Sequence, residues 1–75
     1  MSTAWQKRYQ AASAAIKAQH FAEAEALVAE LHAEASSHDD PQLQSGAYFC
    51  EGMLRDAVGQ LESAEEAFVA ALAAW

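Results

Sequence analysis

The sequence is poor in cysteine, proline and glycine. Of its 75 residues, one is cysteine, one is proline and three are glycine. Cys50 has no partner for a disulfide within the chain, and a lone thiol is typical of a reducing compartment. With so few residues that interrupt a helix, long helical segments are favoured.

Long apolar runs are also missing. The first nine residues lack the apolar core of about 7 to 15 residues that a secretory signal contains, and nowhere do about 18 uncharged apolar residues follow one another. We therefore expect a cytoplasmic protein with no membrane partner.

Basic residues are few. Four Lys and Arg stand against eleven Asp and Glu, which gives a net charge of −7 at pH 7. Binding to nucleic acid or to anionic lipid generally requires a Lys/Arg patch, so we expect neither. All four basic residues fall in segments 4–18 and 41–58, whereas seven of the eleven acids fall in segments 22–36 and 61–75. This distribution predicts one acidic and one less acidic side.

What the sequence does contain is alanine, at 20 positions. Alanine is the best helix former, so we predict an all-α protein without a sheet. The predicted helices cover about 4–18, 22–36, 41–58 and 61–75. Ser2 or Thr3 can cap the first of them, with Gln6 completing a capping box after Thr3.

The helix boundaries are indicated by turn and capping residues. Segment 36–41, which contains Asp40 and Pro41, is the clearest loop, because aspartate caps a helix and proline suits its first position. Gly59 predicts the turn between the last two helices. No comparable breaker is present in segment 17–20, where Gln19 stands at the corresponding position.

The two halves of the chain correspond at an offset of forty residues. The offset pairs Ala12 with Gly52, Gln19 with Gly59, Phe21 with Leu61, Ala24 with Ala64, Val28 with Phe68, Leu31 with Ala71 and His32 with Leu72. A repeat at fixed spacing is typical of a helical array.

This pattern resembles the tetratricopeptide repeat family, which places a small residue in its first helix, glycine at the turn and alternating small and bulky residues down its second helix. The second repeat matches through Gly52, Gly59, Leu61, Ala64, Phe68, Ala71 and Leu72. The first repeat matches less fully, through Ala12, Phe21, Ala24, Val28 and Leu31. The resemblance implies two antiparallel helix-turn-helix hairpins, at about 4–36 and 41–75, in a single domain (1–75) that forms a fragment of a right-handed α-solenoid.

The sequence departs from the family in two respects. Its repeat is forty residues long instead of about 34, so we expect about six extra residues in or beside segment 36–40. The family also usually stacks about three repeats and closes the end with a polar helix, whereas this chain has two repeats and a final segment rich in alanine.

The resemblance implies that the first helix of each hairpin lines a concave, partner-binding face. Carried over, it points to Gln6 and Gly46, with Gly46 leaving a gap, and above all to Tyr9, Ser13, Ile16, Lys17, Phe49, Met53 and Asp56. The larger side chains among these can equally complete a small core, since aromatic and methionine stripes at helical spacing are usually core.

The end of the last segment is a candidate surface for self-association. The residues concerned are Ala67, Ala70, Ala71, Ala74 and Trp75. A chain this short buries only about 60% of the surface of its unfolded form, so a homodimer, or capping by a partner, would supplement its stability.

Catalytic and metal-binding patterns are weak. His20, His32 and His38 include no pair spaced three or four residues apart, and no histidine stands next to Cys50 in the sequence. We expect no enzyme, no metal and no cofactor. The leading hypothesis is a protein–protein interaction module, a scaffold or adaptor that self-associates or docks a partner helix or peptide. The alternative is a structural four-helix bundle, or a fragment of a longer repeat array, with no ligand site of its own.

Overall fold

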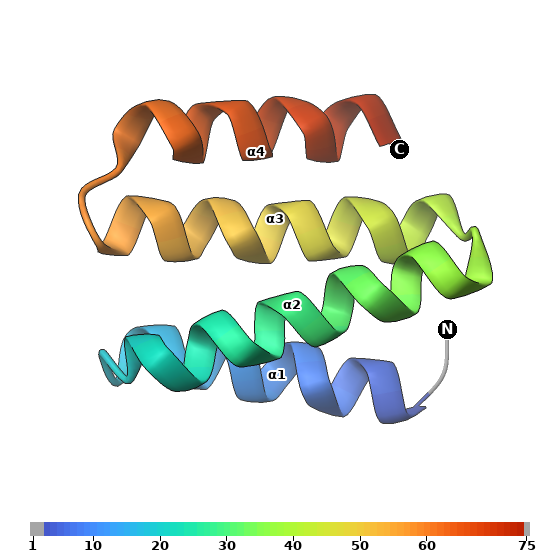
Figure 1. Ribbon diagram of the computed structural model, residues 1–75, viewed down its shortest axis with the longest axis horizontal. Coiled ribbons are helices and arrows are strands. Elements are labelled where there is room, and N and C mark those ends of the chain that lie inside the picture. The colour runs from blue at the N-terminus through green and yellow to red at the C-terminus, as the bar shows by residue number, and fades with distance from the viewer. Residues whose placement is uncertain (1–2, 75) are drawn as a thin grey trace.

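The computed structural model describes residues 3–74, which form four helices (Figure 1). These are α1 (Thr3–Lys17), α2 (Phe21–His38), α3 (Pro41–Ala57) and α4 (Leu61–Ala74). No strand occurs in this part of the chain, so the all-α prediction is confirmed. Ser2 and the side chain of Thr3, the expected caps of the first helix, lie outside the described part.

The helices pack in chain order instead of closing on themselves. α1 packs on α2, α3 packs on both α1 and α2, and α4 packs on α3. Figure 1 shows α4 at one edge of the stack, and within residues 3–74 it makes no contact with α1 or α2. A closed four-helix bundle would bring the first and last helices together, so two hairpins placed side by side describe the arrangement better.

The core lies where α1, α2 and α3 meet. On α2 the buried residues follow the steps of four and three that keep side chains on one helical face; they are Ala24, Val28, Leu31 and Ala35. On α3 the buried apolar side chains are Leu43, Ala47, Cys50 and Leu54. Many of these residues are small, which allows the helices to approach closely.

Both hairpin turns have the same backbone geometry. After α1, the N–H of His20 donates to the carbonyl of Ala15 (2.8 Å) and that of Gln19 to Ile16 (3.0 Å). After α3, forty residues later, the N–H of Gln60 donates to Arg55 (2.8 Å) and that of Gly59 to Asp56 (3.1 Å). These are Schellman motifs, in which the residue after the C-cap is left-handed.

Gln19 therefore takes the conformation of a glycine. Its φ is 63°, against 84° for Gly59. The predicted break between segments 4–18 and 22–36 is confirmed, although no glycine or proline marks it. The paired hydrogen bonds end α1 there despite the unfavourable side chain.

The connection between the hairpins is shorter than expected. α2 continues to His38, so only Asp39 and Asp40 separate it from α3, and the prediction of a loop starting at Ser36 was wrong. Buried Ala35 extends the apolar stripe through this region and favours the helix. The extra repeat length thus lies mostly in helix and not in a loop, because α2 has 18 residues and runs almost to the start of α3.

The start of α3 is as predicted. The Asp40 carboxylate accepts a hydrogen bond from the backbone N–H of Gln42 at 2.9 Å, and Pro41 occupies the first turn. The proline costs no hydrogen bond there, because the first N–H groups of a helix have no partner within it.

Two glycines of α3 each lie against an aromatic ring. A Cβ atom built on Gly52 would lie 2.5 Å from Cε1 of Phe68, and one on Gly46 would lie 2.5 Å from Cη2 of Trp5. Both positions therefore exclude a side chain as the rings now stand. The gap expected at Gly46 is filled by Trp5, which is 3% exposed.

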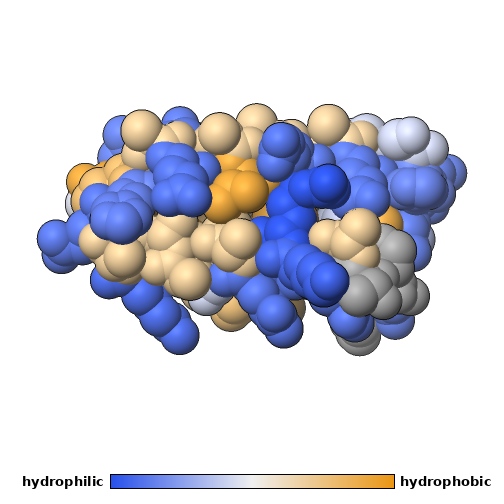
Figure 2. Space-filling view, turned by 90° about the horizontal axis from the view of Figure 1, so that it is seen from below, coloured by the Kyte–Doolittle hydropathy of each residue, from blue (hydrophilic) through white to orange (hydrophobic). Residues whose placement is uncertain are grey.

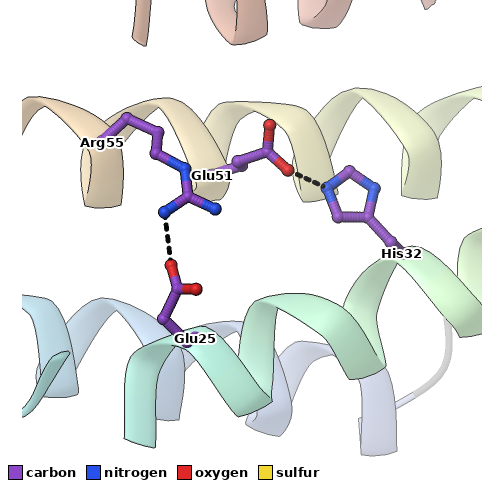
Figure 3. Close-up of polar contacts among 4 residues, drawn as sticks. All are labelled: Glu25, His32, Glu51 and Arg55. Carbon is purple, nitrogen blue, oxygen red and sulfur yellow. Dashed lines mark hydrogen bonds and ion pairs between the residues drawn. The ribbon is translucent and has the colours of Figure 1, made fainter. Parts of the chain in front are cut away.

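Ion pairs connect the first three helices. Arg8 of α1 contacts Glu34 of α2 at 2.6 Å, while Arg55 of α3 contacts Glu25 at 2.5 Å. Figure 3 shows the latter pair beside the 3.0 Å contact between His32 and Glu51. By contrast, the glutamates of α4 form no ion pair within the described chain; they are Glu62, Glu65 and Glu66.

Candidate peptide-binding groove

A groove of about 510 Å³ runs between α1 and α3. Its lining comes from these two helices only: Trp5, Gln6, Tyr9, Gln10, Gln42, Ser45, Gly46 and Phe49. On α3 the lining residues follow steps of three, one and three, which places them on one helical face.

The internal repeat explains why these residues meet. Three pairs of lining residues are related by the forty-residue offset, namely Trp5 with Ser45, Gln6 with Gly46 and Tyr9 with Phe49. α1 and α3 thus present the same helical face to one groove. The small residues of α3, Ser45 and Gly46, leave room opposite the large ones of α1.

The groove has an aromatic interior. The rings of Trp5 and Tyr9 stack with centroids 5.4 Å apart and planes 26° apart. Phe49 leans on Phe68 of α4, with ring centroids at 5.6 Å, and 46% of it remains exposed. An exposed aromatic beside a half-buried one gives a ligand apolar surface to cover.

The remaining lining is polar but uncharged. It contains the amides of Gln6, Gln10 and Gln42 and the hydroxyl of Ser45, with no acidic or basic side chain. The Ser45 hydroxyl donates to the carbonyl of Ala71 at 2.8 Å. A glutamine amide both donates and accepts hydrogen bonds, so this rim matches the N–H and C=O groups of a peptide backbone.

Burial affects two titratable groups beside the groove. It raises the pKa of Tyr9, with a smaller contribution from nearby Cys50. It also raises the pKa of the Cys50 thiol from 9.0 to about 11. Cys50 is 0% exposed, so at neutral pH it is a protonated, buried thiol without nucleophilic character.

The structure separates the seven residues predicted for the concave face. Tyr9 and Phe49 line the groove. Ile16 is buried and Met53 packs against the core, as the alternative interpretation held for these two. The other three do not line the groove: Ser13 is half-buried, whereas Lys17 and Asp56 are exposed at the ends of their helices.

Sequence reasoning missed four lining residues. They are Trp5, Gln10, Gln42 and Ser45. The offset offered a signal for two of them, because it pairs Trp5 with Ser45 and places both four residues before the predicted Tyr9 and Phe49.

The surface expected for self-association differs from the exposed surface. Ala67 and Ala71 are buried against α3 and Ala70 and Ala74 are half-buried, so the predicted alanines do not form an exposed patch. Trp75 lies outside the described residues. The exposed apolar side chains of α4 are instead Leu61, Val69 and Leu72.

The described residues contain no cluster suited to a metal ion and no membrane-spanning helix. Between residues 3 and 74, no three side chains of His, Cys, Asp or Glu lie close enough together to bind a metal ion. No helix in this range is both long and apolar enough to cross a bilayer. Comparisons with protein-family models, curated proteins and solved structures gave no match.

Proposed function

We propose that this protein is a tetratricopeptide-like interaction module that binds a segment of another protein in the groove between α1 and α3. The observation that carries the proposal is Phe49, which is 46% exposed in an uncharged groove beside Tyr9. An exposed aromatic side chain is tolerated in water, but covering it with an apolar ligand is favourable in free energy. The role is that of a scaffold or adaptor.

The lining specifies the chemistry of the ligand. Because the groove has no charged side chain, it offers no partner for a carboxylate, a phosphate or a basic group. The glutamine amides instead favour backbone hydrogen bonds, and Tyr9 and Phe49 favour an apolar or aromatic side chain. The ligand is therefore a neutral peptide segment with one apolar anchor.

The relation to tetratricopeptide repeats is supported by the geometry of both hairpins. Their turns match hydrogen bond for hydrogen bond at the forty-residue offset, and their first helices lie side by side. The alternative of a closed structural bundle is disfavoured, because α4 contacts neither α1 nor α2 in the described chain.

Selection of peptides displayed on phage, followed by calorimetry, tests the proposal. We expect the selected peptides to be neutral and to carry an aromatic or aliphatic residue. The Gln10→Glu variant should bind them about tenfold more weakly, because it places a negative charge beside a peptide backbone. Gln60→Glu is the matched control, since it makes the same change at an exposed glutamine outside the groove and should leave the affinity unchanged.

Two outcomes would contradict the proposal. One is the recovery of strongly charged peptides whose affinity does not depend on Gln10. The other is an equal loss of affinity in Gln10→Glu and Gln60→Glu, which would indicate a general effect of charge and not a contact in the groove.

A further inference from the structure

The exposed large hydrophobic residues are confined to the second half of the described chain. They are Phe49, Val58, Leu61, Val69 and Leu72. Three of them form the outer edge of α4: Leu61 is 65% exposed, Val69 58% and Leu72 79%. α1 and α2 expose no residue of this kind, so the two ends of the stack differ.

The forty-residue offset shows what covers the equivalent edge of α2. Leu72 corresponds to His32, and Glu65 corresponds to Glu25. On α2 both residues contact α3: His32 lies edge-on to Tyr48, with ring centroids at 4.8 Å, and Glu25 pairs with Arg55 (Figure 3). The edge of α4 is thus the counterpart of a surface that holds a helix.

A second hollow lies at this edge. It measures about 340 Å³ and is lined by Ser45, Phe49, Phe68, Ala71 and Leu72. The residues forty positions earlier are Trp5, Tyr9, Val28, Leu31 and His32. Four of these pack in or against the core that includes α3, and the fifth, His32, contacts α3 directly. The second hairpin therefore repeats the surface on which α3 packs in the first hairpin, which we call the seat. No helix within residues 3–74 covers this seat on the second hairpin.

A second copy of the chain is a poor occupant in head-to-tail order. In that arrangement, α1 of the second copy would pack on α4 as α3 packs on α2. Lys7 and Gln10 would then occupy the positions that Ala47 and Cys50 hold in α3, and both of these are 0% exposed. Burying an unpaired lysine is costly. Figure 2, which views the molecule from the side of α1 and α2, shows hydrophilic side chains mixed with weakly hydrophobic ones around one strongly hydrophobic area near the centre.

A symmetric dimer through α4 is also disfavoured. Glu62, Glu65 and Glu66 lie beside Val69 and have no ion pair within the described chain. A two-fold contact would bring these like charges of two chains together, and each chain carries a net charge of −7.

We propose that the outer edge of α4 docks a basic amphipathic helix of another protein, seated as α3 sits on α2. Small side chains occupy the positions of Ala47 and Cys50 in this helix, where the backbones approach. An apolar residue faces Leu72, where α3 presents Glu51 to His32. An arginine or lysine faces Glu65, as Arg55 faces Glu25.

The probe is a peptide of residues 41–58, the segment that already occupies the equivalent seat. It carries Glu51→Leu, to suit Leu72, and is cross-linked between positions 49 and 56, which are exposed on α3 and span two helical turns. Circular dichroism verifies that the cross-linked peptide is helical. Its binding to the whole chain is measured by fluorescence anisotropy, and we expect saturation.

Three variants of the whole chain locate the peptide. Leu72→Glu should weaken binding by about tenfold or more, because the bound peptide would cover this leucine and would instead have to cover a charged side chain. Glu65→Lys should weaken it about fivefold, and Arg55→Glu in the peptide should restore affinity to that variant. Glu23→Lys is the control, since it makes the same charge change at an exposed position of α2, away from the edge of α4, and should have no effect.

Other results would overturn the proposal. A helical peptide that shows no saturable binding up to about 1 mM excludes the seat. Binding that is unchanged in Leu72→Glu places the peptide elsewhere, for example on α2 in exchange for α3. Sedimentation that shows a dimer dissociated by Leu72→Glu identifies a second copy as the occupant. Because Gln10 lies outside this edge, Gln10→Glu should not affect the peptide, and failure of the groove proposal would leave this one standing.

Discussion

Replacing Gly52 by alanine is expected to destabilise the protein even though alanine is the better helix former. The added Cβ would lie 2.5 Å, 2.7 Å and 2.9 Å from three atoms of the Phe68 ring, against an ordinary carbon–carbon contact of about 3.5 to 4.0 Å. The ring has to move by about 1 Å. Phe49, packed on Phe68 with centroids at 5.6 Å, limits that movement.

The expected magnitude is a balance of two terms. Alanine in place of glycine within a helix favours the folded state by about 1 kcal/mol. Overpacking a filled site costs about 2 to 3 kcal/mol. The free energy of unfolding of Gly52→Ala should therefore fall by about 1 to 2 kcal/mol, a drop of roughly 4 to 16 °C in Tm for a domain of this size.

The first repeat supplies the compensating change. There, Ala12 and Val28 stand at the positions of Gly52 and Phe68. Phe68→Val alone should cost about 2 kcal/mol through lost packing. In that background Gly52→Ala should stabilise by about 1 kcal/mol, because the clash is gone and the helix propensity remains. The coupling between the two positions is then about 2 to 3 kcal/mol.

Urea denaturation followed by circular dichroism measures this cycle. Gly59→Ala is the control, because a Cβ on Gly59 would meet nothing within 4 Å. Its φ of 84° makes alanine unfavourable by about 1 kcal/mol in either background, independently of Phe68. If Gly52→Ala stabilises equally with phenylalanine and with valine at position 68, the ring does not pack on Gly52 and the reasoning is refuted.

Two further predictions concern the first turn and the buried thiol. Gln19→Gly should raise the free energy of unfolding by about 1 kcal/mol in urea titrations, and Gly59→Gln should lower it by a similar amount, because both positions have a positive φ; a loss of stability in Gln19→Gly would contradict the strain. Cys50 should react with thiol reagents at pH 8 only through unfolding, and stability should decline as the pH rises from 9.0 to about 11, since the unfolded thiol loses its proton first. Cys50→Ala should reduce that decline and leave the part due to Tyr9, whose folded pKa is also raised; an unchanged pH profile would contradict the assignment.

The fold could be predicted largely because local signals agreed with it. The Asp40–Pro41 start of α3 and the turn at Gly59 are fixed by short-range chemistry, namely a cap, a missing N–H and a positive φ. The break after α1 was predicted, but the left-handed conformation of Gln19 was not, because two backbone hydrogen bonds, and not the residue type, set it. The end of α2 was misplaced because Ala35 is buried, a tertiary effect that outweighs the preference of the following serines for turns.

The candidate site was less predictable, because its members meet only through packing. Trp5 reaches the groove by filling the space above Gly46, forty-one residues away in the chain. No local sequence pattern predicts that contact. Leu72 shows the opposite error. It matches the repeat pattern of the second hairpin, yet it is 79% exposed because α3 leaves it uncovered.

The groove between α1 and α3 is tested most directly by nuclear magnetic resonance. The side-chain NH₂ groups of Gln6, Gln10 and Gln42 give separate signals and lie in the lining, whereas that of Gln60 lies at the turn between α3 and α4. On titration with a selected neutral peptide, we expect the three groove signals to shift with one common Kd and the Gln60 signal to stay in place. If the Gln60 signal shifts and the groove signals do not, the peptide binds elsewhere and the proposed function of the groove is wrong.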